Sequence, residues 1–398
     1  MLAAGRSARR GSISSKLDQV SASGIRRFFE LIDTTDGVIS LGVGEPDFST
    51  PNHISQAAIR SIEQGETAYT SNFGLMELRE LITNQLSRLY GAAYDPQNEV
   101  IVTTGVSEAL NLATQAILDE GDEVISTDPS YVAYMPTVVF AGGKFVTVAV
   151  KAEDGFQLQP DALEAAITPS TKAVLLGYPA IPTGATMSRA ALEAIADVVE
   201  RHDLFVISDE IYDRLVYGVE HVSFPSLPRM KERTILLGGF SKAYAMTGWR
   251  LGYVCAPPLI TDAMMRVHQY IMMSAPTAAQ YAALEALRNG EEDVQGMLGE
   301  YNRRRQLVIK ACRDMGLELN EPHGAFYAFP SIKSTGLDDE EFAGRLLLEE
   351  KVAVVPGQAF GPGGAGHVRI CYAQKYELLE EAMHRMARFV HHYRNTSK

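Results

Sequence analysis

Between residues 98 and 253, short runs of apolar and often β-branched residues alternate with stretches in which apolar residues recur at helical spacing. The runs are almost continuously apolar, which is typical of strands that are covered on both faces. Alternating strands and helices indicate a mainly parallel α/β sheet. We predict seven strands, at residues 100–104, 123–127, 144–150, 172–178, 204–209, 234–238 and 252–256. We predict helices at residues 107–118, 131–141, 160–167, 189–202 and 276–288.

The C-terminal third has a different pattern. A long helix is predicted for residues 292–315, and we interpret its basic run, Arg303, Arg304 and Arg305, as a solvated face. Shorter elements follow in a mixed order that is typical of an α+β domain. We predict strands at residues 325–329, 352–355 and 367–371, and helices at residues 337–350 and 376–392.

The predicted fold class is therefore α/β, with a large domain built on the seven-stranded sheet and a smaller α+β domain. A length of 398 residues supports this division, because it exceeds what one hydrophobic core usually organises. We expect residues 1–50 to form an N-terminal arm and part of the small domain. Residues 51–288 would form the large domain, and residues 289–398 the remainder of the small one.

Composition narrows the classes of function. The chain is 46% hydrophobic and 21% charged, as in ordinary globular proteins, and its net charge of −13 argues against nucleic-acid or membrane partners. The three cysteines, Cys255, Cys312 and Cys371, are widely spaced, which indicates reduced cytoplasmic thiols and neither disulfides nor a metal site. The Arg- and Ser-rich start, residues 1–16, is interpreted as a mobile arm in preference to a targeting peptide.

The segment 239–253 contains the strongest chemical signal. Lys242 and Arg250 lie eight residues apart among apolar, small and hydroxylated residues, and an unpaired buried ammonium costs several kcal/mol. Desolvation lowers a lysine pKa and frees its amine to condense with an aldehyde, while an arginine can fork onto a phosphate. The pair therefore indicates a pyridoxal phosphate pocket. The alternative is a lysine paired with a carboxylate and an arginine that only packs.

Three further segments carry matching chemistry. Asp209 ends an apolar strand, where a carboxylate points into the crevice that binds ligands in α/β proteins, although it could instead cap a helix. Residues 103–107 join a strand to a helix, whose free N–H groups suit a phosphate, although Ser107 is also a good N-cap. Arg369 lies inside a short apolar strand and offers a planar fork for a carboxylate.

In this order the motifs resemble those of fold-type I pyridoxal phosphate enzymes, specifically class I aminotransferases of the aspartate/aromatic group. The resemblance extends from about Ser21 to Tyr393. It implies that Lys242 carries the cofactor as a Schiff base, that Asp209 pairs with the pyridine nitrogen and that Tyr212 donates to the phenolic oxygen. These three residues are the expected catalytic set.

The resemblance also implies contacts to the phosphate and to the ring. Gly105, Val106, Ser107 and Arg250 would bind the phosphate. Tyr131 would stack on the ring, and Tyr134 is the alternative that packs in the core.

Two further contacts are implied at the edges of the site. Tyr69 would reach the phosphate of a neighbouring subunit, which implies a homodimer with composite active sites. Arg369 and the backbone of Gly44 would bind the α-carboxylate of the substrate. Residues 324–327 also match the family pattern, in a role that could be packing alone.

The chain departs from the family at two positions. Ile181 occupies the place of an asparagine that donates to the phenolic oxygen, and Gly239 replaces a serine that binds the phosphate in aspartate enzymes. Ile181 can donate no hydrogen bond, and such a bond to a charged group is worth roughly 1.5–3 kcal/mol. We expect this change to weaken catalysis without abolishing it, and to move the optimum to higher pH.

The predicted activity is transfer of an amino group from aspartate or an aromatic L-amino acid to a 2-oxo acid such as 2-oxoglutarate. Residues 25–29 resemble branches that accept both donors, and Arg26 or Arg27 could pair with a second carboxylate. Three alternatives remain open: a carbon–sulfur lyase or cyclopropane-carboxylate synthase on the same fold, a ligand-binding regulator, and a scaffold that has lost catalysis.

Overall fold

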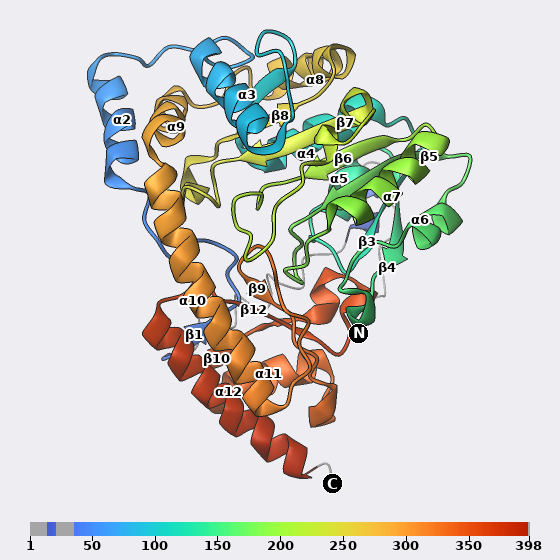
Figure 1. Cartoon of the computed structure of the whole chain (residues 1–398), viewed down its shortest axis with the longest axis vertical. Coiled ribbons are helices and arrows are strands. Elements are labelled where there is room, and N and C mark those ends of the chain that lie inside the picture. Colours follow the sequence, from blue (N-terminus) through green and yellow to red (C-terminus); the bar gives the residue numbers. More distant parts are fainter. Residues whose placement is uncertain (1–13, 21–35, 397–398) are drawn as a thin grey trace.

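The computed structural model describes residues 14–20 and 36–396. Its main feature is a seven-stranded sheet in the order β2-β8-β7-β6-β5-β3-β4 (Figure 1). All its strands run parallel except β8, which pairs antiparallel with both β2 and β7. The strands are β2 (Val100–Thr103), β3 (Glu123–Asp128), β4 (Lys144–Ala149), β5 (Thr171–Gly177), β6 (Phe205–Asp209), β7 (Thr234–Gly239) and β8 (Gly252–Cys255). The predicted α/β class and all seven predicted strands are confirmed.

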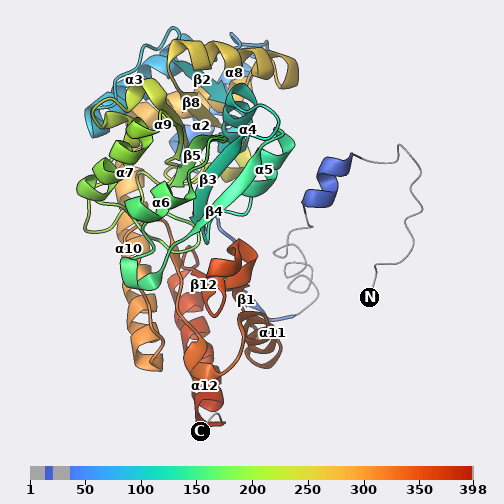
Figure 2. The ribbon, with the colours of Figure 1, turned by 90° about the vertical axis from the view of Figure 1, so that its right-hand side faces the viewer.

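Helices cover both faces of this sheet because its strands are apolar on both sides. In β5, Ala173 and Leu175 pack toward one helical layer, while Val174 and Leu176 pack toward the other, as the two-residue period of a strand requires. The first layer contains α4 (Gly105–Ile117), α5 (Tyr134–Phe140) and α8 (Pro258–Ile271). The second contains α6 (Pro160–Ala166) and α7 (Arg189–Arg201), and beside them α2 (Asn52–Glu63), α3 (Met76–Tyr90) and α9 (Thr277–Asn289). Figure 2 shows the sheet between these layers.

The C-terminal third forms a second body of helices and short strands. It contains α10 (Glu291–Met315), α11 (Asp339–Glu350) and α12 (Tyr376–Thr396), with α10 and α12 side by side in Figure 1. A three-stranded antiparallel sheet joins β11 (Val355–Pro356), β12 (Val368–Cys371) and β9 (Tyr327–Ala328). Strand β1 (Ile39–Ser40) pairs parallel with β10 (Val352–Ala353), so residues near the N-terminus pack in the C-terminal core. The three predicted domain ranges stay a prediction.

Short 3₁₀ helices connect these elements. They are η1 (Ser15–Gln19), η2 (Ala152–Asp154), η3 (Phe224–Ser226), η4 (Lys231–Arg233), η5 (Thr247–Trp249), η6 (Lys333–Thr335), η7 (Gly357–Phe360) and η8 (Pro362–Gly364).

Some predicted elements differ from those observed. The single strand predicted at residues 352–355 is two strands, because the chain leaves its partner β1 after Ala353 and pairs with β12 from Val355. The helix predicted from residue 131 begins at Tyr134, after a turn. The elements β1, α2, α3 and α8 were absent from the prediction.

The interpretation of the basic run in α10 as a solvated face is wrong for two of its three arginines. Arg304 is 4% exposed and Arg305 is 5% exposed. Arg304 pairs with Asp47 at 2.6 Å and with Glu300 at 3.0 Å, so its charge is compensated where it is buried. The contact with Asp47 ties α10 to the loop that follows β1.

Two other expectations concern membranes and metals. Across residues 14–20 and 36–396, no helix combines the length and the apolar character that crossing a bilayer needs. Within the same ranges, no group of three or more His, Cys, Asp or Glu side chains is arranged to hold a metal ion. The three cysteines are buried free thiols.

Candidate active site

Most of the predicted site residues lie at one edge of the large sheet. Parallel strands end together at this edge, so the residues that follow β2, β3, β5, β6 and β7 meet there (Figure 1). The antiparallel β8 begins at the same edge, which brings in Arg250 from the preceding turn. A cavity of about 460 Å³ is located here. Ten of the predicted residues line it: Gly44, Val106, Ser107, Tyr131, Ile181, Asp209, Tyr212, Lys242, Arg250 and Arg369.

Lys242 projects from the turn after β7 into this cavity. Its Nζ donates to the carbonyl of Gly44 at 2.7 Å and lies 5.7 Å from the ring centroid of Tyr212 and 5.6 Å from that of Phe326. Burial lowers the pKa of Lys242 to about 8, and the nearby cations Arg369 and Arg250 act in the same direction. A substantial fraction of this amine is therefore neutral, and nucleophilic, near physiological pH.

Asp209 also lines the cavity, as the last residue of β6. Its side chain accepts a hydrogen bond from the hydroxyl of Tyr134 at 2.9 Å and another from the backbone N–H of Ile211 at 3.3 Å. Burial raises the pKa of Asp209 to about 6, and the two hydrogen bonds oppose that rise. The carboxylate therefore gains from a cationic partner in the cavity.

Tyr134 is a functional partner that the sequence reasoning missed. It was considered only as a core alternative to Tyr131, whereas its hydroxyl directly supports Asp209. The two rings pack edge to face at 5.4 Å, with Tyr131 lining the cavity and Tyr134 buried beneath it. A Cβ on Gly177 would lie 2.2 Å from the hydroxyl of Tyr134, so only glycine leaves room for this support.

The turn into α4 combines free backbone N–H groups with a cation. Gly105 has a φ of 76°, and a Cβ on it would lie 2.9 Å from the guanidinium of Arg250, so the arginine packs directly over the turn. The helix N-terminus and this guanidinium together attract an anion. Gly105 contributes backbone to the turn and does not itself line the cavity.

A buried pair below this turn was also missed. Glu108 accepts a hydrogen bond from the backbone N–H of Thr104 and lies 2.7 Å from Nδ1 of His268 in α8. Both side chains are buried, so the contact fixes the backbone of the turn against the adjoining helix. No local sequence signal points to a pairing across 160 residues.

The C-terminal body contributes Arg369, from β12, and Tyr327, from β9, to the lining of the cavity. Arg369 is 6% exposed, donates to the carbonyl of Gly42, and lies 4.7 Å from the ring centroid of Tyr327. Its Nε is buried and has no hydrogen-bond partner among the described residues. An unsatisfied buried donor of this kind suits a ligand carboxylate.

Two predicted contacts at the edges of the site stay predictions. Tyr69 is 79% exposed and does not line the cavity formed by its own chain. Residues 25–29, including Arg26 and Arg27, lie outside the described residues.

At the two family departures, the geometry is informative. Ile181 lines the cavity and packs against the cores on both sides of it. A Cβ on Gly239 would lie 3.1 Å from side-chain atoms of Ile211 and Val106 and 3.2 Å from the Cα of Gly252. A serine at residue 239 would therefore require its neighbours to shift.

Comparison with known proteins identifies the family. Residues 36–386 match the family described as Aminotransferase class I and II. The chain belongs to this family.

Similar proteins carry related names. A putative aminotransferase of Bacillus subtilis is 52% identical over 95% of this chain and 98% of its own. An aromatic-amino-acid aminotransferase of Thermococcus litoralis is 44% identical over 94% and 97%, and an aspartate aminotransferase of Pyrococcus abyssi is 47% identical over 94% and 97%.

Solved structures agree. An aspartate aminotransferase from Thermus thermophilus with maleate superposes with a TM-score of 0.90 at 40% identity, covering 95% of this chain and 99% of that one. An aromatic aminotransferase from Pyrococcus horikoshii gives a TM-score of 0.88 at 46% identity, covering 92% and 99%. The chain is therefore a transaminase of the type I fold, and its family uses pyridoxal phosphate.

The residues of the aminotransferase cavity fit this cofactor. Lys242 would offer an amine to the aldehyde, Asp209 a carboxylate to a protonated ring nitrogen, and Tyr212 a hydroxyl to the phenolic oxygen, since all three line the cavity. The turn into α4 and Arg250 offer N–H donors to the phosphate. Bound there, the cofactor supplies an electron sink for charge that develops at the substrate Cα.

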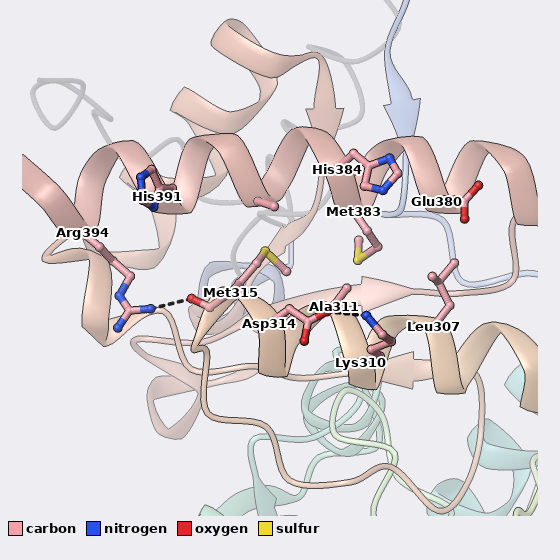
Figure 3. A pocket seen from close by; sticks show the side chains of 11 residues that line it. Leu307, Lys310, Ala311, Asp314, Met315, Glu380, Met383, His384, His391 and Arg394 are labelled. Atoms are coloured by element: carbon pink, nitrogen blue, oxygen red, sulfur yellow. Dashed lines mark hydrogen bonds and ion pairs between the residues drawn. The ribbon is translucent and has the colours of Figure 1, made fainter.

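A second cavity of the aminotransferase, of about 530 Å³, lies between α10 and α12 (Figure 3). Its cations already have protein partners: Lys310 pairs with Asp314 at 2.6 Å, and Arg394 donates to the carbonyl of Met315 at 2.6 Å. None of the predicted site residues lines it. It therefore does not compete with the cavity at Lys242 as the reaction site.

The lowered pKa of Lys242 predicts how the rate of covalent cofactor uptake by the cofactor-free protein depends on pH. The neutral amine forms as pH rises through about 8, so the rate of covalent uptake should increase through that pH and then level off. Arg369→Gln should move this midpoint upward, because it removes a cation that lowers the Lys242 pKa. Borohydride trapping across pH, followed by peptide mass mapping, measures both midpoints.

The matched control is Arg303→Gln, which removes a surface arginine of α10 and should leave the midpoint unchanged. A midpoint near the ordinary lysine value of 10.5 in the unaltered protein would contradict the burial of this amine.

Proposed function

We propose that this aminotransferase moves the amino group of an aromatic L-amino acid or of aspartate to a 2-oxo acid such as 2-oxoglutarate, at the cavity around Lys242. The observation that carries the proposal is that Lys242, Asp209 and Arg369, from three distant parts of the chain, line one cavity. The names of the similar proteins support both donor classes. They give no support to the lyase alternative.

In this proposal each side chain acts on a stated atom. Lys242 would bind the cofactor and, once displaced by the substrate amine, would take the proton from the substrate Cα and deliver it as a general acid to C4′ of the cofactor. Its lowered pKa suits both directions of that transfer. Asp209 keeps a proton on the ring nitrogen, and Tyr134 keeps Asp209 in place.

Substrate orientation falls to Arg369 and Gly44. A carboxylate that pairs with the guanidinium of Arg369 would satisfy its unpartnered buried Nε. Gly44 brings backbone close to the same region, and a Cβ there would lie 2.3 Å from the hydroxyl of Tyr327. The anchor fixes which face of the Cα meets Lys242.

The described lining favours an aromatic donor over aspartate. Its cations are Lys242, Arg250 and Arg369, and each already has a proposed role. The remaining lining includes the apolar side chains of Val43, Leu110, Val106, Ile181 and Ile211. An aromatic side chain loses little on entering such surroundings, whereas a second carboxylate needs a compensating cation.

A screen of amino donors against 2-oxoglutarate tests this function. We expect ping-pong kinetics, with higher kcat/KM for phenylalanine or tyrosine than for aspartate, and no turnover by Lys242→Ala. Borohydride reduction should place the cofactor adduct on residue 242. Pyruvate release from cystathionine without any 2-oxo acid, or an adduct elsewhere, would contradict the proposal.

Ile181→Asn should raise kcat/KM by about tenfold, because the amide adds a donor for the phenolic oxygen. The same donor should move the pH optimum downward. Ile181→Leu is the matched control, since it changes shape without adding a donor. If Ile181→Asn behaves like Ile181→Leu, residue 181 does not contact the cofactor or the site is adapted to another reaction.

We also propose that the enzyme is a cytoplasmic homodimer with composite sites. Tyr69 is exposed on its own chain, and exposed apolar side chains also gather at the C-terminal end of α8, where Tyr270 is 87%, Ile271 50% and Met273 43% exposed. The segment that contains Tyr69 adjoins the connection between α8 and α9, since Thr277, the first residue of α9, donates to the carbonyl of Ala68. Clustered exposed apolar side chains suit a subunit interface. Buried free thiols and the net charge of −13 suit the cytoplasm.

Light scattering should give twice the chain mass of 43.5 kDa. Tyr270→Asp should dissociate the dimer and weaken cofactor binding, because burying a charge at the interface is unfavourable.

Tyr69→Phe should keep the dimer but raise the cofactor Kd by about 10- to 100-fold, because it removes one hydrogen bond to a charged group. The control Leu348→Asp alters an equally apolar exposed residue of α11 and should change neither quantity. An unchanged Kd in Tyr69→Phe would overturn the composite site.

A further inference from the structure

We propose that Tyr327 is a positioning residue, whose hydroxyl donates to Tyr212 and thereby turns the Tyr212 proton toward the phenolic oxygen of the cofactor. The inference rests on the proposed role of Tyr212. It begins with one contact: the hydroxyl oxygens of Tyr212 and Tyr327 lie 2.7 Å apart, and either could donate to the other. Each ring is 1% exposed, and each lines the cavity at Lys242.

The direction of this hydrogen bond decides what Tyr212 can do. A tyrosine hydroxyl carries a single proton. If Tyr212 donates to Tyr327, it can present only lone pairs to an anionic oxygen, and the two repel. If Tyr327 donates, the Tyr212 proton is free for the phenolic oxygen. The order Tyr327, Tyr212, phenolic oxygen then gives every acceptor a donor, and each bond in such a chain polarises the next.

Tyr327 is held firmly enough to perform this task. It lies in β9, where it pairs with Cys371 of β12. The guanidinium of Arg369 lies 4.7 Å from its ring centroid. On the other side, the position of a Cβ on Gly44 is only 2.3 Å from the Tyr327 hydroxyl, so the Gly44 backbone closes off that direction.

The surroundings of Tyr212 make this orientation consequential. Ile181 lines the cavity without any hydrogen-bond donor, so among the cavity-lining residues Tyr212 is the proposed side-chain donor to the phenolic oxygen. The titratable and charged groups that face the tyrosine pair are Lys242, Arg369, Cys371 and Tyr131. Of these, Arg369 is the cation nearest Tyr327, and a nearby cation makes a phenol the better donor.

The test follows the visible absorbance band of the bound cofactor as a function of pH. A hydrogen-bond donor stabilises negative charge on the phenolic oxygen. That oxygen then binds less tightly the proton that it shares with the Lys242 nitrogen. If Tyr212 is removed, or if Tyr327 no longer polarises its hydroxyl, that proton stays bound to higher pH. Tyr212→Phe should raise the pH midpoint of the absorbance change by about one pH unit, and Tyr327→Phe should raise it by about 0.3–0.7 pH unit.

The double variant separates positioning from a direct contact. If Tyr327 acts only through Tyr212, Tyr212→Phe with Tyr327→Phe should match Tyr212→Phe alone, so the two shifts are not additive. Additive shifts, or no shift in Tyr327→Phe, would overturn the inference. Tyr217→Phe is the matched control, because it removes a buried hydroxyl that donates to the carbonyl of Ala325 outside the cavity. Its midpoint should stay unchanged.

A second variant reaches the same contact without altering either tyrosine. Gly44→Ala would place a methyl group on the Tyr327 hydroxyl and should raise the midpoint in the same direction as Tyr327→Phe. This keeps the inference testable if Tyr327→Phe fails to fold, and an unchanged midpoint in Gly44→Ala would then count against it. Absence of any visible band in the unaltered protein loaded with pyridoxal phosphate would overturn the proposed function as well.

Discussion

The desolvation of one amine is the constraint on which the rest of the site depends. Among the described residues, the carbonyl of Gly44 is the one acceptor within hydrogen-bond distance of Lys242, and its other neighbours include aromatic rings and two arginines. Such surroundings would be unfavourable for a permanent charge, and they are tolerable for an amine that is about to lose it. The fold supplies these surroundings by ending several parallel strands at one edge and placing the C-terminal body against that edge.

At the same edge of the sheet, the side chains of two adjacent acidic residues, Asp209 and Glu210, point in opposite directions. Asp209 faces the cavity, whereas Glu210 is turned away and is satisfied by His221, Ser208 and the backbone N–H of Phe224. Adjacent residues of an extended chain point in opposite directions, so only one carboxylate can serve the ligand. Burial is the chief cause of the raised pKa of Asp209. The negative charge of Glu210, which is compensated by protein groups, raises that pKa further.

Local pattern was sufficient for the large sheet and insufficient for contacts between distant segments. Continuous apolar runs identified all seven strands, and the positions of Asp209 at the end of β6 and of Lys242 after β7 followed from them. Very short strands such as β1 and β10 carry too few residues to show a period, and their pairing depends on a partner more than 300 residues away. The arginines of α10 misled because a helical pattern does not reveal an acidic partner such as Asp47 on a distant loop. The contacts of Tyr327, Tyr134 and His268 went unrecognised for the same reason, because their partners are remote in sequence.

The pairing of β1 with β10 has a consequence for how the protein is made. Gly44 follows strand β1, and β1 is completed by β10, whose residues are synthesised more than 300 positions later. Arg369 and Tyr327 also emerge late from the ribosome. A nascent chain can therefore build much of the large sheet early, since domains tend to fold as they emerge, while its reactive lysine remains uncovered. The vitamin B6 pocket is closed only after the residues up to Arg369 have been synthesised.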